Sequence, residues 1–95
     1  MTQTRLSHVT ATAQDWGLTR PPHPAEDHRK RSLPAVATDL NSRLKLICNT
    51  ADSVKQARIA MREQFALFAR YGVPNPKAEQ LVLALVTEAF RPRKH

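Results

Sequence analysis

Two predicted helices separated by the turn Gly72-Val73-Pro74 constrain the fold of this chain more strongly than any other feature of its sequence. In the first, residues 51–71, apolar residues recur at spacings of three and four, which places them on one helical face. That face comprises Val54, Ala57, Met61, Phe65 and Phe68. Asn49 or Thr50 can cap the N-terminus of this helix. Gly72 can end it in the left-handed conformation, and Pro74 prevents its continuation.

The second predicted helix, residues 75–90, begins with Asn75 and Pro76. An asparagine side chain accepts a hydrogen bond from the free amides of a first turn, and proline at the first helical position loses no hydrogen bond. The inner face comprises Ala78, Leu81, Val82, Leu85 and Ala89, and Leu83 and Val86 widen it. One neighbouring helix would not cover so wide an apolar face. We therefore expect a homodimer, because two-fold dimers are the commonest oligomers.

Residues 33–48 support two interpretations. Leu33, Val36, Leu40, Leu44 and Ile47 have helical spacing. Residues 43–48 instead begin as an alternation of polar and apolar side chains, which is typical of a strand. The pattern leaves both conformations open. The predicted fold is therefore mainly α, a small domain of two or three helices over residues 33–95, with a possible short strand at 43–48.

Residues 1–32 differ in composition from the rest of the chain. They hold 8 of the 39 hydrophobic residues, together with three of the seven prolines. Because such a stretch buries too little apolar surface to offset the entropy of ordering it, we predict a disordered tail that is basic and polar. Two interpretations of Trp16 and Leu18 stay open. Either they insert into a pocket of a partner protein, or Trp16 folds back onto the helices.

Size and composition exclude several classes of protein. Ninety-five residues are too few for a barrel or a dinucleotide-binding fold, which need roughly 200 residues or more. The longest apolar run, Leu81–Val86, is far shorter than the about 20 residues of a membrane span. The single cysteine, Cys48, cannot form an internal disulfide, and no apolar signal-peptide core follows Met1. These features predict a cytoplasmic protein without a membrane partner.

Catalysis has little support in the sequence. The four histidines, His8, His23, His28 and His95, lie in the predicted tail or at the last residue, whereas a general base is held rigidly against its substrate. No set of side chains has the spacing of metal ligands. The two glycines are too far apart to form a phosphate-binding loop. We therefore predict a protein that is not an enzyme and that uses no cofactor.

The placement of positive charge is the feature that points to a partner. The chain holds 15 lysines and arginines against 8 acidic residues, a formal net charge of +7. Lys55, Arg58 and Arg62 fall at spacings of three and four on one edge of the 51–71 helix, where like charges repel one another. Two explanations of this stripe are open: it binds an anionic partner, or it is simply a helix face in contact with water. Further basic clusters are Arg29-Lys30-Arg31, Arg43 with Lys45, and Arg91 with Arg93 and Lys94.

A short basic segment with alternating polarity, a helix, a glycine turn and a second helix follow one another in residues 43–90. This order resembles the ribbon-helix-helix family of DNA-binding dimers. The resemblance implies that residues 43–48 pair with the same segment of a second subunit and enter the major groove. Arg43 and Lys45 would then face base edges. It also implies that the start of the second helix, at Lys77, holds a backbone phosphate.

The sequence thus predicts a small basic nucleic-acid-binding protein, a dimeric regulatory or accessory protein that binds double-stranded DNA. The predicted contact residues are Arg29, Lys30, Arg31, Arg43, Lys45, Lys55, Arg58, Arg62 and Lys77. The alternative is a non-enzymatic helical interaction module, an adaptor or inhibitor of a larger assembly, which binds an acidic protein surface. The conformation of residues 43–48 separates the two hypotheses. A paired ribbon favours DNA, and a continuous helix through Leu46 favours the interaction module.

Overall fold

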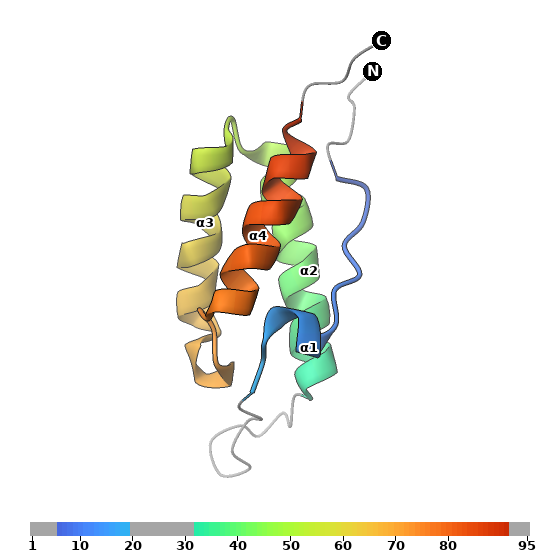
Figure 1. Cartoon of the computed structure of the whole chain (residues 1–95), viewed down its shortest axis with the longest axis vertical. Coiled ribbons are helices and arrows are strands. Elements are labelled where there is room, and N and C mark those ends of the chain that lie inside the picture. The colour runs from blue at the N-terminus through green and yellow to red at the C-terminus, as the bar shows by residue number, and fades with distance from the viewer. Residues whose placement is uncertain (1–5, 20–31, 92–95) are drawn as a thin grey trace.

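The computed structural model describes residues 6–19 and 32–91, and these are mainly helical. The elements in chain order are α1 (Ala13–Trp16), α2 (Leu33–Thr50), α3 (Val54–Leu67), the 3-10 helix η1 (Ala69–Tyr71) and α4 (Pro76–Ala89). The helices α2, α3 and α4 form a bundle in which each runs opposite to the one before it (Figure 1). The segment that leads into α1 runs along α2, and α1 contacts both α2 and α4.

Residues 43–48 lie within α2, so of the two interpretations that the sequence left open the helical one is confirmed and the possible short strand is wrong. In a strand Leu44 and Leu46 would face the same side. In the structure Leu44 is fully buried, whereas Leu46 is 64% exposed. The helical spacing prevails because it buries a full row of side chains, namely Val36, Leu40, Leu44 and Cys48. Without a strand at this place, the described residues lose the feature on which the ribbon-helix-helix resemblance depended.

The helix predicted over residues 51–71 is divided into α3 and η1. Its N-cap is Ser53, whose hydroxyl accepts a hydrogen bond from the Gln56 amide at 3.2 Å. The predicted caps Asn49 and Thr50 are instead in the last turn of α2. Serine is as good an N-cap as asparagine, and the short link at residues 51–53 lets the chain reverse between two long helices.

The turn and the second predicted helix are confirmed in detail. Gly72 adopts the left-handed conformation with a φ of 110° directly after η1. Asn75 is the N-cap of α4, its Oδ1 accepting a hydrogen bond from the Ala78 amide at 2.9 Å, and Pro76 is the first helical residue. These short-range signals involve only residues within one turn of each other, which explains why the sequence was sufficient to locate them.

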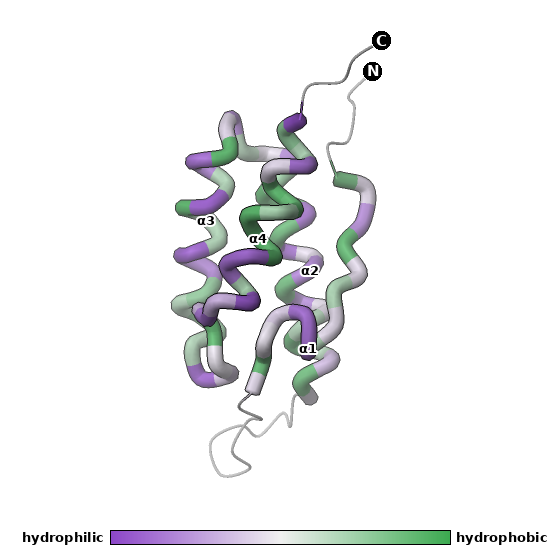
Figure 2. Tube along the Cα trace, viewed as in Figure 1, coloured by the Kyte–Doolittle hydropathy of each residue, from purple (hydrophilic) through white to green (hydrophobic). Residues whose placement is uncertain are grey.

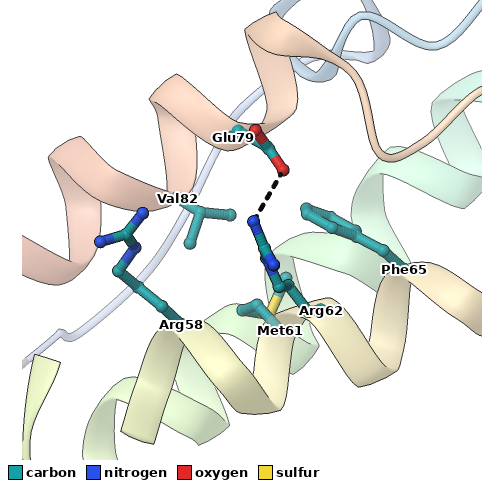
Figure 3. Close-up of a pocket in the computed structure, with 6 residues that line it drawn as sticks. All are labelled: Arg58, Met61, Arg62, Phe65, Glu79 and Val82. Atoms are coloured by element: carbon teal, nitrogen blue, oxygen red, sulfur yellow. Dashed lines mark ion pairs between the residues drawn. The ribbon is translucent and has the colours of Figure 1, made fainter. Parts of the chain in front are cut away.

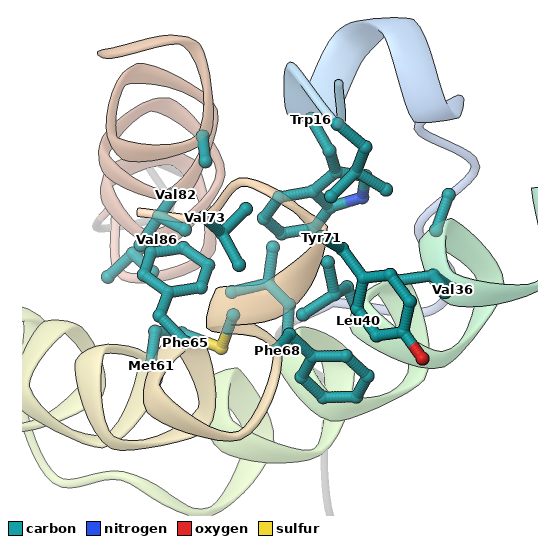
Figure 4. Packing of buried hydrophobic residues seen from close by; sticks show 14 of the residues in the cluster. Trp16, Val36, Leu40, Met61, Phe65, Phe68, Tyr71, Val73, Val82 and Val86 are labelled. Atoms are coloured by element: carbon teal, nitrogen blue, oxygen red, sulfur yellow. The ribbon is translucent and has the colours of Figure 1, made fainter. Parts of the chain in front are cut away.

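The predicted inner faces of α3 and α4, apart from Leu83, lie in the hydrophobic core or pack against it, together with the inner face of α2 (Figure 4). Figure 2 shows hydrophobic and hydrophilic residues interspersed along both helices, as expected where one face is buried. Leu81 and Leu85 of α4 are partly buried against this core, and Leu83 is 44% exposed. Since α1 also packs on α4, the chain itself covers part of the apolar face that the sequence assigned to a second subunit.

Trp16 is fully buried in the core, which corrects the prediction of a tail without a core for the described residues 6–19. Its ring packs edge to face against Phe65, with ring centroids 6.1 Å apart (Figure 4). Leu18 is buried as well. Both side chains are therefore part of the core, and the interpretation in which Trp16 folds back onto the helices is confirmed. Residues 1–5 and 20–31 of the predicted tail lie outside the described residues, and Ser32, its last residue, is the N-cap of α2.

Two asparagines of α2 bind the segment that precedes α1. Asn41 is buried and accepts a hydrogen bond from the Trp16 indole nitrogen at 2.7 Å, while its amide nitrogen donates to the Ala11 carbonyl at 2.8 Å. Asn49 accepts from the Leu6 amide at 3.2 Å and donates to the Leu6 carbonyl at 2.8 Å. The two asparagines thus provide hydrogen-bond partners for backbone groups of Leu6 and Ala11. Because unpaired backbone groups are costly to bury, these bonds favour packing of the N-terminal segment on α2.

Gly17, which ends α1, contacts the start of α4 through a hydrogen bond. It has a φ of 72°, and its carbonyl accepts a hydrogen bond from the Asn75 side chain at 3.0 Å. A Cβ atom at this position would lie 2.5 Å from Asn75 Oδ1, which is too close.

Gly17→Ala should therefore lower the free energy of unfolding by about 1–3 kcal/mol. The left-handed conformation alone costs an alanine about 1 kcal/mol, and the clash adds to it. Urea denaturation followed by circular dichroism measures the loss. A stability equal to that of the wild-type protein would mean that α1 does not dock on α4 in solution.

Candidate functional site

A small pocket lies between α3 and α4, beside the basic stripe predicted from the sequence. Its lining residues are Arg58, Met61, Arg62, Phe65, Glu79 and Val82 (Figure 3). The apolar residues belong to the core or its edge, and the two arginines stand over them from α3. The structure thus combines positive charge and apolar surface at one place.

The charges around this pocket are only partly compensated. Arg62 lies 3.6 Å from a carboxylate oxygen of Glu79, and both side chains are at least half exposed. An ion pair so exposed to water stabilises the fold by at most about 1 kcal/mol. Within the described ranges 6–19 and 32–91, no carboxylate is within ion-pair distance of Lys55 or Arg58. Two of the three cations of the stripe therefore have their charge available for a partner.

Exposed apolar side chains flank the stripe on both helices. Ile59 of α3 is 51% exposed and lies next to Arg58 in the sequence, one turn before Arg62. Leu83 of α4 is 44% exposed and follows Glu79 by four residues, so the two share one face of α4. We call the surface formed by Lys55, Arg58, Ile59, Arg62, Glu79 and Leu83 the α3–α4 surface.

Arg43, predicted to read DNA bases, contributes to the packing of α2 against α3. Its Nε donates to Asp39 at 3.0 Å, and another guanidinium nitrogen donates to the Gln64 side chain. The guanidinium carbon also lies 5.0 Å from the centre of the Phe68 ring, in a cation–π contact. With the conformation of residues 43–48 corrected to helix, this arginine links two helices of the bundle.

The remaining predicted contact residues lie apart from the α3–α4 surface. Lys45 is exposed one turn before Asn49, on the edge of α2 that faces the N-terminal segment. Lys77 lies beside a separate pocket near α1, and the first turn of α4 is capped by Asn75. Residues 29–31 are outside the described part of the chain. Of the six predicted contact residues that the structure describes, only Lys55, Arg58 and Arg62 lie together on one surface.

The sequence did not assign Ile59, Leu83 or Glu79 of this surface to a binding site. For Glu79 the reason is its distance along the chain. It is seventeen residues from Arg62, and only the antiparallel packing of α3 and α4 brings the two together. Along the sequence, Asp52 and Glu63 are the acids nearest to the stripe. Spacing can identify only such neighbours along one helix. No local signal could have identified the pair.

The positive charge of the chain is distributed unevenly. Eight of the 15 lysines and arginines lie in the described residues, with six of the 8 acidic residues, so this part carries +2 of the formal net charge of +7. The other +5 belongs to residues 1–5, 20–31 and 92–95. The described part of the chain is thus only weakly basic, and three of its eight basic residues lie along one edge of α3.

No protein-family model, no curated protein and no solved structure matches this chain. Within the described residues, histidine, cysteine and carboxylate side chains do not gather into a group that could hold a metal ion. None of the helices in that part of the chain is both long and apolar enough to cross a membrane.

Proposed function

We propose that this chain is a non-enzymatic interaction module that binds an acidic protein surface through the α3–α4 surface. The observation that carries the proposal is the combination, in one place, of two exposed large apolar side chains and two cations that have no carboxylate partner among the described residues. A protein partner that presents carboxylates beside apolar residues would satisfy both at once. Burial of apolar surface would add affinity that does not depend on salt.

The conformation, the exposed apolar side chains and the small net charge of the described residues favour this hypothesis over sequence-specific DNA binding. A ribbon for the major groove is missing from residues 43–48, which are helical. Phosphate groups would interact with Lys55 and Arg58 but would gain nothing from Ile59 or Leu83. The described residues also carry little net charge, whereas affinity for a duplex comes mainly from the number of phosphates neutralised.

Nucleic-acid binding is kept as a second candidate because of one specific observation. Of the formal net charge of +7, +5 belongs to residues outside the described part of the chain, which include the cluster Arg29-Lys30-Arg31. Basic segments of this kind bind polyanions without a defined interface. In this second candidate, Lys55, Arg58 and Arg62 would add phosphate contacts to those of the basic segments.

Titrations followed by NMR distinguish the two candidates. We expect a peptide of leucine and glutamate to shift the amide signals of Lys55, Arg58, Ile59 and Leu83. A peptide of serine and glutamate should bind at least about tenfold more weakly, because about 1.4 kcal/mol of apolar burial is missing. A DNA duplex is the third probe. Binding of the duplex alone, with a slope of log affinity against log salt of about −0.9 per phosphate contact, would favour the second candidate and overturn the first.

A further inference from the structure

The three cations of the α3–α4 surface are spaced as the residues of a helix. Lys55, Arg58 and Arg62 are separated by three and four residues on α3, which corresponds to rises of about 4.5 and 6 Å along the helix axis. A second helix that lies along α3 presents its own residues i, i+3 and i+7 with the same two rises. In a strand, residues on one side recur about every 6.6 Å, so three carboxylates would not stay in register.

The packing of α3 and α4 offers a straight site for such a helix. The two helices lie side by side and run in opposite directions (Figure 1). Side chains on neighbouring helices leave grooves into which a further helix packs at a small angle, as in four-helix bundles. Ile59 on α3 and Leu83 on α4 would lie on either side of it, with Met61 and Val82 at the base of the pocket between the helices.

Glu79 indicates how a carboxylate is received on this surface. Its carboxylate oxygen lies 3.6 Å from Arg62, above the pocket that contains Val82. One turn earlier on α3, Arg58 extends over the same pocket (Figure 3), and no carboxylate in the described part of the chain pairs with it. Lys55 follows at the next turn. The chain therefore supplies one carboxylate of a row of three and leaves two positions for another molecule.

We infer that the α3–α4 surface binds one amphipathic helix of a partner protein, with glutamates or aspartates facing Lys55 and Arg58 and apolar residues against Ile59 and Leu83. The inference rests on the proposed function and specifies its partner. The partner helix acts as a fourth helix of the bundle. Specificity comes from the match of charge spacing, and affinity comes from the apolar contacts.

Two labelled peptides of identical composition test the inference. Each contains leucine, alanine and glutamate over about 18 residues, which is about 27 Å of helix. In one, leucines and glutamates follow the helical period; in the other, the order is scrambled. Fluorescence anisotropy at physiological ionic strength should show at least about tenfold tighter binding of the periodic peptide, a difference of about 1.4 kcal/mol. Its circular dichroism should show helix formation on binding.

Charge reversals locate the peptide on the protein. Arg58→Glu should weaken binding of the periodic peptide by at least about tenfold, since attraction is replaced by repulsion. Lys45→Glu changes the net charge equally but lies on α2, and it should change the affinity by less than about twofold, because charges farther apart than about 8 Å are screened. A periodic peptide with lysine in place of glutamate should bind the double variant Lys55→Glu, Arg58→Glu. Circular dichroism checks that each variant is folded.

The outcomes separate this inference from the proposed function. Equal binding of the periodic and scrambled peptides would overturn the helical partner and leave the acidic protein surface in place. Equal weakening by Arg58→Glu and Lys45→Glu would overturn the assignment to the α3–α4 surface. Failure of both peptides to bind the wild-type protein, even at low salt where charge attraction is strongest, would overturn the proposed function itself.

Discussion

Trp16→Ala should lower the free energy of unfolding by about 3–5 kcal/mol, the usual cost of truncating a fully buried aromatic side chain. Trp16 packs against Phe65 and is joined through Asn41 to α2, so its removal leaves a cavity and undocks α1 at the same time. Small domains are stable by only about 5–15 kcal/mol, so the variant is expected to be partly unfolded at physiological temperature. Urea denaturation followed by circular dichroism measures the effect.

Trp16→Phe is the matched control for this substitution. It keeps an aromatic ring in the core but removes the indole donor to Asn41. We expect a smaller loss, dominated by the cost of an unsatisfied buried acceptor, about 1–3 kcal/mol. A Trp16→Ala protein within about 0.5 kcal/mol of the wild type, as is usual for surface substitutions, would show that residues 6–19 are not part of the core.

Asn41→Ala should lower the free energy of unfolding by about 2–5 kcal/mol, the second large effect. The substitution leaves the Trp16 indole nitrogen and the Ala11 carbonyl without a hydrogen-bond partner beside α2. Each unsatisfied buried group costs about 1–3 kcal/mol. Thermal and urea denaturation measure the loss, and the Trp16 fluorescence spectrum should change because its polar neighbour is gone.

Asn49→Ala provides the comparison. Asn49 also bonds the N-terminal segment, at Leu6, but it is only half-buried, so water can replace the lost bonds. Its substitution should cost about 1 kcal/mol, the net value of an ordinary hydrogen bond.

The losses of Trp16→Ala and Asn41→Ala should not add up in the double variant, because the two residues share one interaction. Additive losses would contradict the shared contact.

The N-terminal segment shows how an average over composition can mislead. Residues 1–32 are poor in apolar side chains, but one tryptophan buries as much surface as several smaller residues. A local signal was available in this segment. Thr12 and Asp15 form a capping box around α1, and Gly17 ends it in the left-handed conformation. That signal predicts a helical turn, although it gives no information about the place where the turn docks.

Residues 43–48 show the opposite case, in which two local patterns compete. Both the helical row through Leu44 and the alternation of Leu44 with Leu46 are present in the same six residues. The choice depends on what the segment packs against. A helix buries Leu40, Leu44 and Cys48 in the core. A strand at this position would need a partner strand to satisfy its backbone groups. The rest of the described chain forms helices and connecting segments and supplies no such strand.

Local patterns were sufficient for the inner faces of α3 and α4, the Asn75 cap, the Gly72 turn and the spacing of the basic stripe, because each involves residues within one or two helical turns. Packing alone placed Trp16 against Asn41, 25 residues away, and Arg43 against Gln64, 21 residues away. It also placed Glu79 opposite Arg62. Such contacts depend on which helices become neighbours, and that is set by the combined burial of the whole core rather than by any segment of the chain.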